Sequence, residues 1–317
     1  MINLRAAAVG LGLAALLIPR SGHSQIPTFQ SQAEVASSLQ LVPVDSIPDF
    51  GTFFLLSGQL DESLPSIPLP YDLYHGTEPV YALDAARGTF AGGNGCGLPI
   101  DSGVILSSGD ITNAIGPNDN SMAETTFYSD GDRDLEKLVG TNGTTCDAAV
   151  LEFDIISTNS FILQFQYIYA SEEYPEWIGQ YNDPMAIFVS TNRVGTNWIN
   201  SITNDIALVP GTTNVPVGVN NINGGCVGDA HTNYVSSPTN PQYYMDNHDP
   251  DLSAVPPYAV AAPVFNIQYD GTTVLLTAQK LISANVTNHI KIAIADYKDA
   301  DYDSAVFIKT WSPCQCP

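Results

Sequence analysis

The chain has 317 residues, with 33 Asp and Glu against 10 Lys and Arg, and a formal net charge of −23. A surface this acidic repels nucleic acid and anionic lipid, so neither is an expected partner. It suits divalent cations, because oxygen-rich carboxylate loops bind calcium, although acidity also keeps an exported protein soluble.

Residues 1–24 are typical of a secretory signal peptide. Arg5 supplies the positive start, residues 6–18 form the apolar segment, and Ser24 is the expected last residue removed. The apolar run is short for a spanning helix, and no later run is long enough to insert into a membrane. We therefore expect a secreted protein that is extracellular or held at the cell surface.

Residues 25–87 are rich in Pro, Ser and Leu and predict an extended lead-in with two short edge strands. From residue 88, turns rich in Gly, Asn and Asp separate short β-rich runs. The expected strands are 103–107, 149–155, 161–170, 184–190, 205–209, 215–220, 264–269, 272–278, 289–296 and 304–310. The pattern predicts an all-β domain over residues 88–310, a jelly-roll-like β-sandwich with long loops, followed by a Cys-containing tail at 311–317.

Local signals refine this outline. The strand at 161–170 alternates, so one face is expected to carry Phe161, Leu163, Phe165, Tyr167 and Tyr169. The pair Asp270-Gly271 predicts a tight hairpin turn, and residues 134–139 predict one short helix. Residues 223–260 form a long insertion, and an ordered loop of that length is usually functional or pinned.

Two acidic loops are the most specific chemical feature, one after the strand at 161–170 and one before the strand at 304–310. Calcium takes six to eight oxygens from flexible loops, and unpaired carboxylates repel one another unless a cation or protonation relieves them. Only Lys298 lies nearby in sequence. We predict a calcium site at the sandwich edge, built from one or both loops, with the candidate ligands Glu172, Glu173, Asp183, Asp296, Asp299, Asp301 and Asp303.

The alternative is that these side chains cap turns or accept hydrogen bonds from backbone amides. A third acidic stretch, residues 129–136, is a weaker metal candidate. Arg133 and Lys137 partly neutralise it, and the start of a helix explains Asp134.

Aromatic residues in the first loop support a different function. Tyr174, Trp177 and Tyr181 recur at intervals of three and four and suit a carbohydrate-binding, lectin-like module. The opposing view is that Trp177 packs over the edge of the core, as Trp usually does. A glycoside hydrolase is the weakest alternative, because it needs two carboxyl groups about 5 to 9 Å apart across a cleft, and the sequence selects no such pair. We expect no enzyme.

The cysteines permit disulfides in an exported protein, but their odd number leaves one thiol over. Cys226 is placed to anchor the long insertion through a disulfide. Cys314 and Cys316 in the tail are too close in sequence to bridge each other easily. The candidates are Cys96, Cys146, Cys226, Cys314 and Cys316.

The chain resembles the choice-of-anchor L domain in four stretches: IDSGVILSSGDITNAIGPND from residue 100, DAAVLEFDI from 147, YASEEYPEWIGQYNDPMAIFVS from 169 and HIKIAIADYKDADYDSAVFIKT from 289. The resemblance covers about residues 88–310. It implies export, surface display and a role in adhesion or extracellular matrix, and it implies no enzyme activity or ligand. No anchor is evident after Lys309, which favours a released protein or one held by non-covalent contacts.

Together these observations predict a secreted, non-catalytic structural or adhesive module stabilised by calcium. Its expected partner is a cell-surface or matrix component, with polysaccharide as one candidate.

Overall fold

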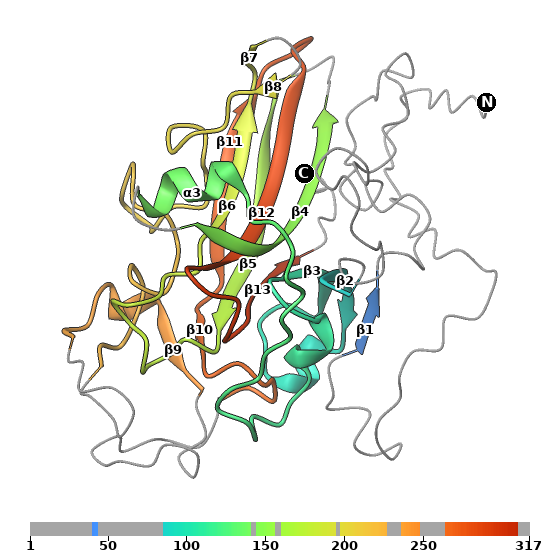
Figure 1. The fold of residues 1–317 in the computed structure, drawn as a ribbon. Helices are drawn as coiled ribbons and strands as arrows, with labels where there is room; N and C mark the ends of the chain where they lie inside the picture. The colour runs from blue at the N-terminus through green and yellow to red at the C-terminus, as the bar shows by residue number, and fades with distance from the viewer. Residues whose placement is uncertain are drawn as a thin grey trace.

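The computed structural model describes residues 40–43, 85–140, 144–155, 160–194, 197–226, 236–247 and 264–309. These residues form an all-β sandwich, which confirms the predicted fold class (Figure 1). The predicted signal peptide, most of the lead-in and the tail lie outside the described residues. No helix among the described residues is long and apolar enough to cross a membrane.

The larger sheet has the order β1-β2-β3-β13-β5-β10-β9, and β11 also pairs with β5. Its strands are β1 (Gln40–Pro43), β2 (Arg87–Ala91), β3 (Ser102–Ser107), β5 (Phe161–Ser171), β9 (Tyr244–Asp246), β10 (Gly271–Thr273), β11 (Leu276–Ile282) and β13 (Ser304–Lys309). The smaller sheet, in the order β4-β12-β6, contains β4 (Thr145–Ile155), β12 (Asn288–Tyr297) and β6 (Met185–Ser190).

Few other regular elements occur in the described segments. A short hairpin joins β7 (Arg193–Val194) to β8 (Asn197–Trp198). The helices are α3 (Arg133–Val139) and the 3-10 turns η3 (Gly93–Cys96), η4 (Ile111–Ala114) and η5 (Pro241–Tyr243).

Side-chain alternation explains why the two sheets face each other. On β5, the predicted inward residues Leu163, Phe165, Tyr167 and Tyr169 are buried in the main core. On β12, Ile290, Ile292 and Ile294 meet them from the opposite sheet. Successive residues of a strand point to opposite faces, so each strand supplies one apolar row to the space between the sheets.

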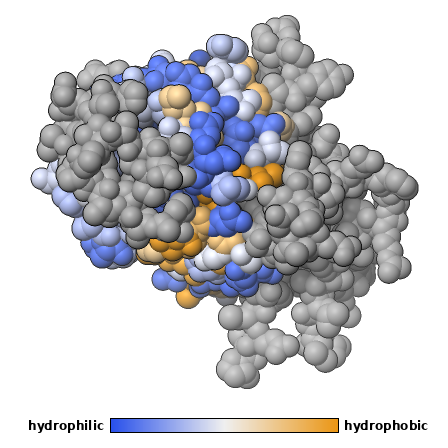
Figure 2. All heavy atoms as spheres, turned by 90° about the horizontal axis from the view of Figure 1, so that it is seen from below, coloured by the Kyte–Doolittle hydropathy of each residue, from blue (hydrophilic) through white to orange (hydrophobic). Residues whose placement is uncertain are grey.

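Both sheets are also covered on their outer faces. Ile168, Ala170 and Phe307 pack beneath loop segments on the far side of the larger sheet. Leu135 of α3 packs on Ala293 and other small residues of the smaller sheet. All ten residues of β12 are therefore buried. The helix predicted at 134–139 is confirmed, and Asp132 caps it by accepting hydrogen bonds from two backbone N–H groups. On the face shown in Figure 2, the described surface mixes hydrophilic residues with smaller apolar areas.

The region after residue 263 differs from the prediction. Residues 264–269 form only an isolated bridge at Ile267, and residues 272–278 divide into β10 and the start of β11. Val274 lies in the gap between β10 and β11, and its backbone N–H donates to the carbonyl of Tyr243. Segments 205–209 and 215–220 likewise make isolated bridges instead of regular strands.

The predicted Asp270-Gly271 hairpin turn is wrong. Asp270 is buried, and its carboxylate accepts a hydrogen bond from Asn118 Nδ2 at 2.7 Å. Gly271 begins β10, where a Cβ atom would lie 2.6 Å from the ring of Tyr174. Glycine is needed at this position for close packing and not for a turn conformation.

No disulfide joins any two of the described cysteines. Cys96 and Cys226 are buried and Cys146 is half-buried, while Cys314 and Cys316 lie outside the described residues. Within the insertion, the backbone N–H groups of Cys226 and Ser236 instead donate hydrogen bonds to each other's carbonyl.

Candidate metal centre

Most of the predicted calcium ligands collect at one end of the sandwich, where the two acidic loops leave the strands. Ser304 at the start of β13 pairs with Ser171 at the end of β5, so the two loops meet there. The inward row of β12 also ends at this point, with Asp296 following Ile294. We call these six carboxyl groups the acidic centre: Glu172, Glu173, Asp183, Asp296, Asp299 and Asp303.

Burial separates the members of this set. Five of the six are fully buried, and Asp299 is half-buried. Asp301, the seventh predicted ligand, is exposed at the surface. Charged side chains are almost never fully buried unless they are paired, so five buried carboxyl groups require a physical explanation.

The acidic centre contains buried oxygens with no hydrogen-bond partner in the structure. Glu172 and Asp296 each leave both carboxyl oxygens unpartnered, and Glu173, Asp299 and Asp303 each leave one. Ser108 lies close enough to Asp296 to lower its pKa somewhat, but the Ser108 hydroxyl hydrogen-bonds with the backbone of Ser304. An unpartnered buried carboxylate is among the most costly groups a fold can contain.

Neighbouring carboxylates raise the pKa values of the carboxyl groups in the centre. Burial raises the pKa of Glu173 well above its ordinary value, and the charges of Asp183 and Asp299 raise it further. Burial likewise raises the pKa of Asp296, with Asp183 and Asp303 adding to the effect. These groups are therefore close enough to repel one another when ionised.

Glu172 follows the last residue of β5 and is fully buried. Burial raises its pKa well above the ordinary value, followed by the charges of Asp270 and Asp303. Asp270 is not predictable from the sequence as a neighbour of Glu172, because an Asp before a Gly is the usual signal of a turn. Its burial beside Glu172 becomes apparent only when β10 pairs with β5.

Asp183 is the best-satisfied member. It accepts hydrogen bonds from the backbone N–H of Tyr297 at 3.0 Å and from the hydroxyl of Ser304 at 2.7 Å. The Tyr169 hydroxyl donates to the Asp183 carbonyl at 3.0 Å. Burial still raises the pKa of Asp183 well above its ordinary value despite these donors. The hydroxyl of Ser304 on β13 and the backbone N–H of Tyr297 on β12 therefore fix the position of this carboxylate.

Asp303 is held from the opposite side. One of its oxygens accepts hydrogen bonds from Asn113 Nδ2 at 2.7 Å and from the Thr125 N–H at 3.0 Å, which leaves the other without a partner. Burial raises the pKa of Asp303 from 3.8 to about 7, and Glu124 and Asp147 contribute to the rise. At neutral pH this group is thus poised between its two protonation states.

The absence of a side chain at Gly109 leaves space for the Asp303 carboxylate. A Cβ atom on Gly109 would lie 1.8 Å from Asp303 Oδ2. The substitution Gly109→Ala is expected to displace that carboxylate and to cost about 1–3 kcal/mol of unfolding free energy, measured by urea denaturation. Gly218→Ala is the control, because its Cβ would lie 3.1 Å from a side-chain oxygen of Asn182. Equal losses in the two variants would contradict a specific role for Gly109.

No positive side chain among the described residues neutralises the acidic centre. Lys298 directs its Nζ to the carbonyl of Gln180 at 2.6 Å and lies over the rings of Tyr181 and Tyr297. The ion pairs formed between described residues involve other carboxylates. Protonation or a bound cation must therefore offset the repulsion within the centre.

The carboxylates share a region without converging on a point. Among the residues that the structure describes, no three His, Cys, Asp or Glu side chains stand in an arrangement that could hold a metal ion as they are. Binding a cation would require several of these side chains to rotate toward it. Calcium tolerates such adjustment, because its ligand geometry is flexible and its ligands are oxygens.

The aromatic residues near the centre divide into two kinds. The ring of Trp177 meets those of Tyr181 and Tyr302 edge-on, at centroid distances of 5.3 and 5.6 Å. These three rings are half-buried. Tyr174 is fully buried, and its hydroxyl donates to the carbonyl of Ile222 at 2.7 Å. The prediction that Tyr174 contacts a sugar is wrong, because its ring belongs to the core.

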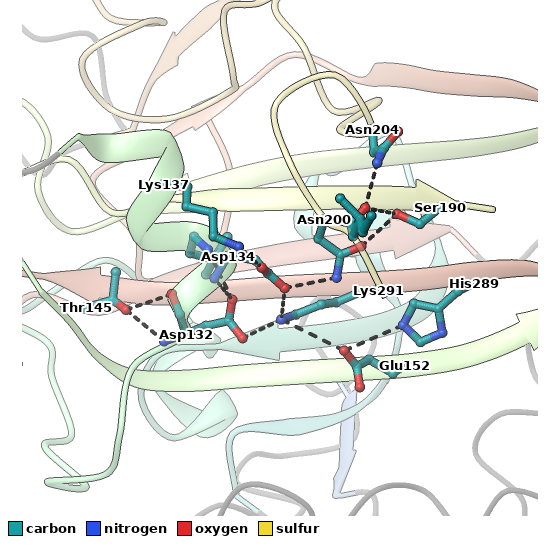
Figure 3. Close-up of polar contacts among 12 residues, drawn as sticks. Asp132, Asp134, Lys137, Thr145, Glu152, Ser190, Asn200, Asn204, His289 and Lys291 are labelled. Atoms are coloured by element: carbon teal, nitrogen blue, oxygen red, sulfur yellow. Dashed lines mark hydrogen bonds and ion pairs between the residues drawn. The ribbon is translucent and has the colours of Figure 1, made fainter. Parts of the chain in front are cut away.

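The third acidic stretch has a partner that sequence analysis missed. Asp132 and Asp134 both contact Lys291 of β12, and Asp134 also pairs with Lys137 (Figure 3). The prediction that the start of a helix explains Asp134 is confirmed, because Asp134 lies in the first turn of α3. The partner was not predictable, because Lys291 lies 159 residues from Asp132 in the chain.

Comparison with known proteins agrees with the motifs in the sequence. No curated protein and no solved structure matches the chain. The family model for the choice-of-anchor L domain matches residues 74–313, which is more than half of the chain. The chain therefore belongs to the choice-of-anchor L domain family.

Proposed function

We propose that the chain is an exported, non-catalytic adhesive module whose acidic centre binds calcium. Family membership indicates a surface-associated, non-enzymatic module, and the calcium-binding and adhesive roles are our additions. In this proposal the cation holds the two acidic loops in one geometry. The ordered loops then meet a cell-surface or matrix component.

One observation carries the calcium proposal. Both carboxyl oxygens of Glu172 and both of Asp296 are buried without a hydrogen-bond partner. Buried polar groups are normally satisfied, and oxygens that no protein donor reaches are the ones a cation would take. The centre contains neither His nor Cys, which favours calcium over zinc.

A thermal melt of the full-length protein tests the proposal. We expect the melting temperature to be lowest in EDTA and to rise in millimolar calcium, but not in equimolar magnesium. A ligand that binds only the folded state adds about 2.7 kcal/mol at a hundredfold excess over its dissociation constant. The rise should disappear in the variant that combines Asp299→Asn with Asp303→Asn. An unchanged melting temperature in wild-type protein would leave protonation as the explanation for the buried carboxylates.

Carbohydrate binding is a second candidate function, favoured by the half-buried group of Trp177, Tyr181 and Tyr302 beside the acidic centre. Aromatic rings stack on the apolar faces of sugars. Burial raises the pKa of Tyr181, and the charge of Asp299 raises it further, so this ring lies beside the centre. On an array of glycans, we expect wild-type protein to bind in calcium and Trp177→Ala to lose that signal. Tyr128→Ala is the matched control, because Tyr128 is an exposed aromatic residue that is not one of the rings in contact in this group. Absence of wild-type binding to every glycan would remove this candidate.

A further inference from the structure

A buried lysine lies among carboxylates on the outer face of the smaller sheet. Lys291 is 1% exposed, and its Nζ lies 2.5 Å from Asp132 Oδ2 and 2.9 Å from Asp134 Oδ2. Glu152 Oε1 is 3.8 Å away. Figure 3 shows the Lys291 side chain pointing between these acids, which come from the start of α3 and from β4. This group is separate from the acidic centre.

The carboxyl group of Asp132 is held in one orientation. Its Oδ1 accepts hydrogen bonds from the backbone N–H of Asp134 at 2.9 Å and of Leu135 at 3.1 Å. Its Oδ2 is the oxygen that faces Lys291. The backbone N–H of Asp132 is itself bound to Thr145 Oγ1 at 2.8 Å. The lysine nitrogen therefore meets a carboxyl group whose other oxygen already has two donors.

We propose that Lys291 and Asp132 condense to an intramolecular isopeptide bond. The lysine nitrogen attacks Cγ of Asp132, the N–C bond forms, and the bond from Cγ to Oδ2 breaks. Oδ2 leaves as water with two of the three ammonium hydrogens, and the third stays on the amide nitrogen. The positive and negative charges cancel, so the step needs no oxidant, reductant or co-reactant.

The surrounding groups suit each part of this reaction. Negative charge that develops on Oδ1 during attack is met by the two backbone N–H donors, as in an oxyanion hole. Asp134 is placed to accept a proton from the lysine nitrogen and return it to the departing oxygen. Lys291, Lys137 and Asn200 outweigh the effect of burial and lower the pKa of Asp134, so Asp134 is in the basic form that this role needs.

Burial favours the product over the ion pair. Burial alone would lower the pKa of Lys291, but Asp132 and Asp134 raise it, so the reactants begin as a buried ammonium and carboxylate. The amine must lose a proton to the neighbouring carboxylates before attack. A buried ion pair is penalised by desolvation, whereas a neutral amide avoids that penalty and keeps the hydrogen bonds to Oδ1. The bond would tie the loop before α3 to the central strand β12.

Mass spectrometry of the purified full-length protein tests this proposal. We expect the intact mass to be lower by one water molecule than the sequence requires. A tryptic digest is expected to contain one branched peptide, in which the segment with Lys291 is joined to the segment that ends at Arg133. Two separate linear peptides together with the full mass would overturn the proposal and leave an ordinary buried ion pair.

Variants distinguish the chemistry from other losses of water. Lys291→Arg retains the charge but is expected to have the full mass. Asp132→Asn would give the same amide by losing ammonia, so its mass should equal that of wild type. Asp134→Asn is expected to leave a linear fraction, while Lys309→Met, which removes an exposed lysine that contacts Gln166 outside this group, should react fully. Circular dichroism confirms that each variant is folded, and a water loss that persists in Lys291→Arg would contradict the assignment.

Discussion

Replacing Glu172 by Gln and Asp296 by Asn is expected to stabilise the cation-free protein and to abolish its response to calcium. Each of these two residues leaves both of its carboxyl oxygens buried without a hydrogen-bond partner, which makes four of the seven such oxygens in the acidic centre. An uncompensated buried charge costs about 3–5 kcal/mol, and a domain of this size gains about 2–4 °C per kcal/mol, so a rise of roughly 10 °C in EDTA is expected. The new amide groups can also donate to the remaining carboxylates.

The measurement is a thermal melt of the double variant and wild type, each in EDTA and in millimolar calcium. Asp119→Asn is the matched control, because it removes one exposed carboxylate outside the centre and should change neither quantity. A double variant that still responds to calcium like wild type would place the cation elsewhere. A double variant less stable than wild type in EDTA would mean that repulsion in the centre is not the dominant cost.

The second prediction is that, in the absence of calcium, the unfolding free energy falls as the pH rises. Burial raises the pKa of Asp303 to about 7, and it also raises those of Glu172 and Asp296 well above their ordinary values. A carboxyl group with a higher pKa in the folded state binds its proton more tightly when folded. Its contribution to stability is therefore complete below the unfolded pKa, near 4, and is lost as the pH rises through the folded pKa.

For Asp303 alone, the rise in pKa from 3.8 to about 7 corresponds to a loss of unfolding free energy on the order of 4 kcal/mol as the pH increases. We expect urea denaturation in EDTA to give a higher unfolding free energy at pH 5 than at pH 7.5. Calcium should remove most of this difference, because it binds the ionised carboxylates. Equal pH dependence with and without calcium would contradict the proposed occupant of the centre.

Two groups outside the centre also lower the unfolding free energy as the pH rises, and calcium should not change their contribution. Burial raises the pKa of Asp205 to about 7, although it accepts hydrogen bonds from the N–H groups of Ala207 and Ile187. Burial lowers the pKa of His289, but Asp154 and Glu152 outweigh this effect and raise it. Asp205→Asn is therefore a useful control: it should flatten the profile in calcium and leave the calcium response intact.

The sequence by itself predicted the features that depend on local periodicity. The strand at 161–170 was assigned with its correct inward face, because an alternating row of Phe, Leu and Tyr can be buried in only one way. The helix at 134–139 was assigned from its pattern, and the acidic cap before it agrees. Local patterns failed at Asp270-Gly271 and Tyr174. Both are buried by strands and loops far away in the chain.

Composition and spacing also identified the acidic loops as the chemically distinctive part of this family member. Only the tertiary structure decided which carboxylates are buried together and which, like Asp301, remain in solvent. It also brought Lys291 to Asp132 and Asp270 to the side of Glu172. Sequence patterns report the faces of single elements, whereas the pKa and the reactivity of a side chain depend on burial and on neighbours that distant strands supply.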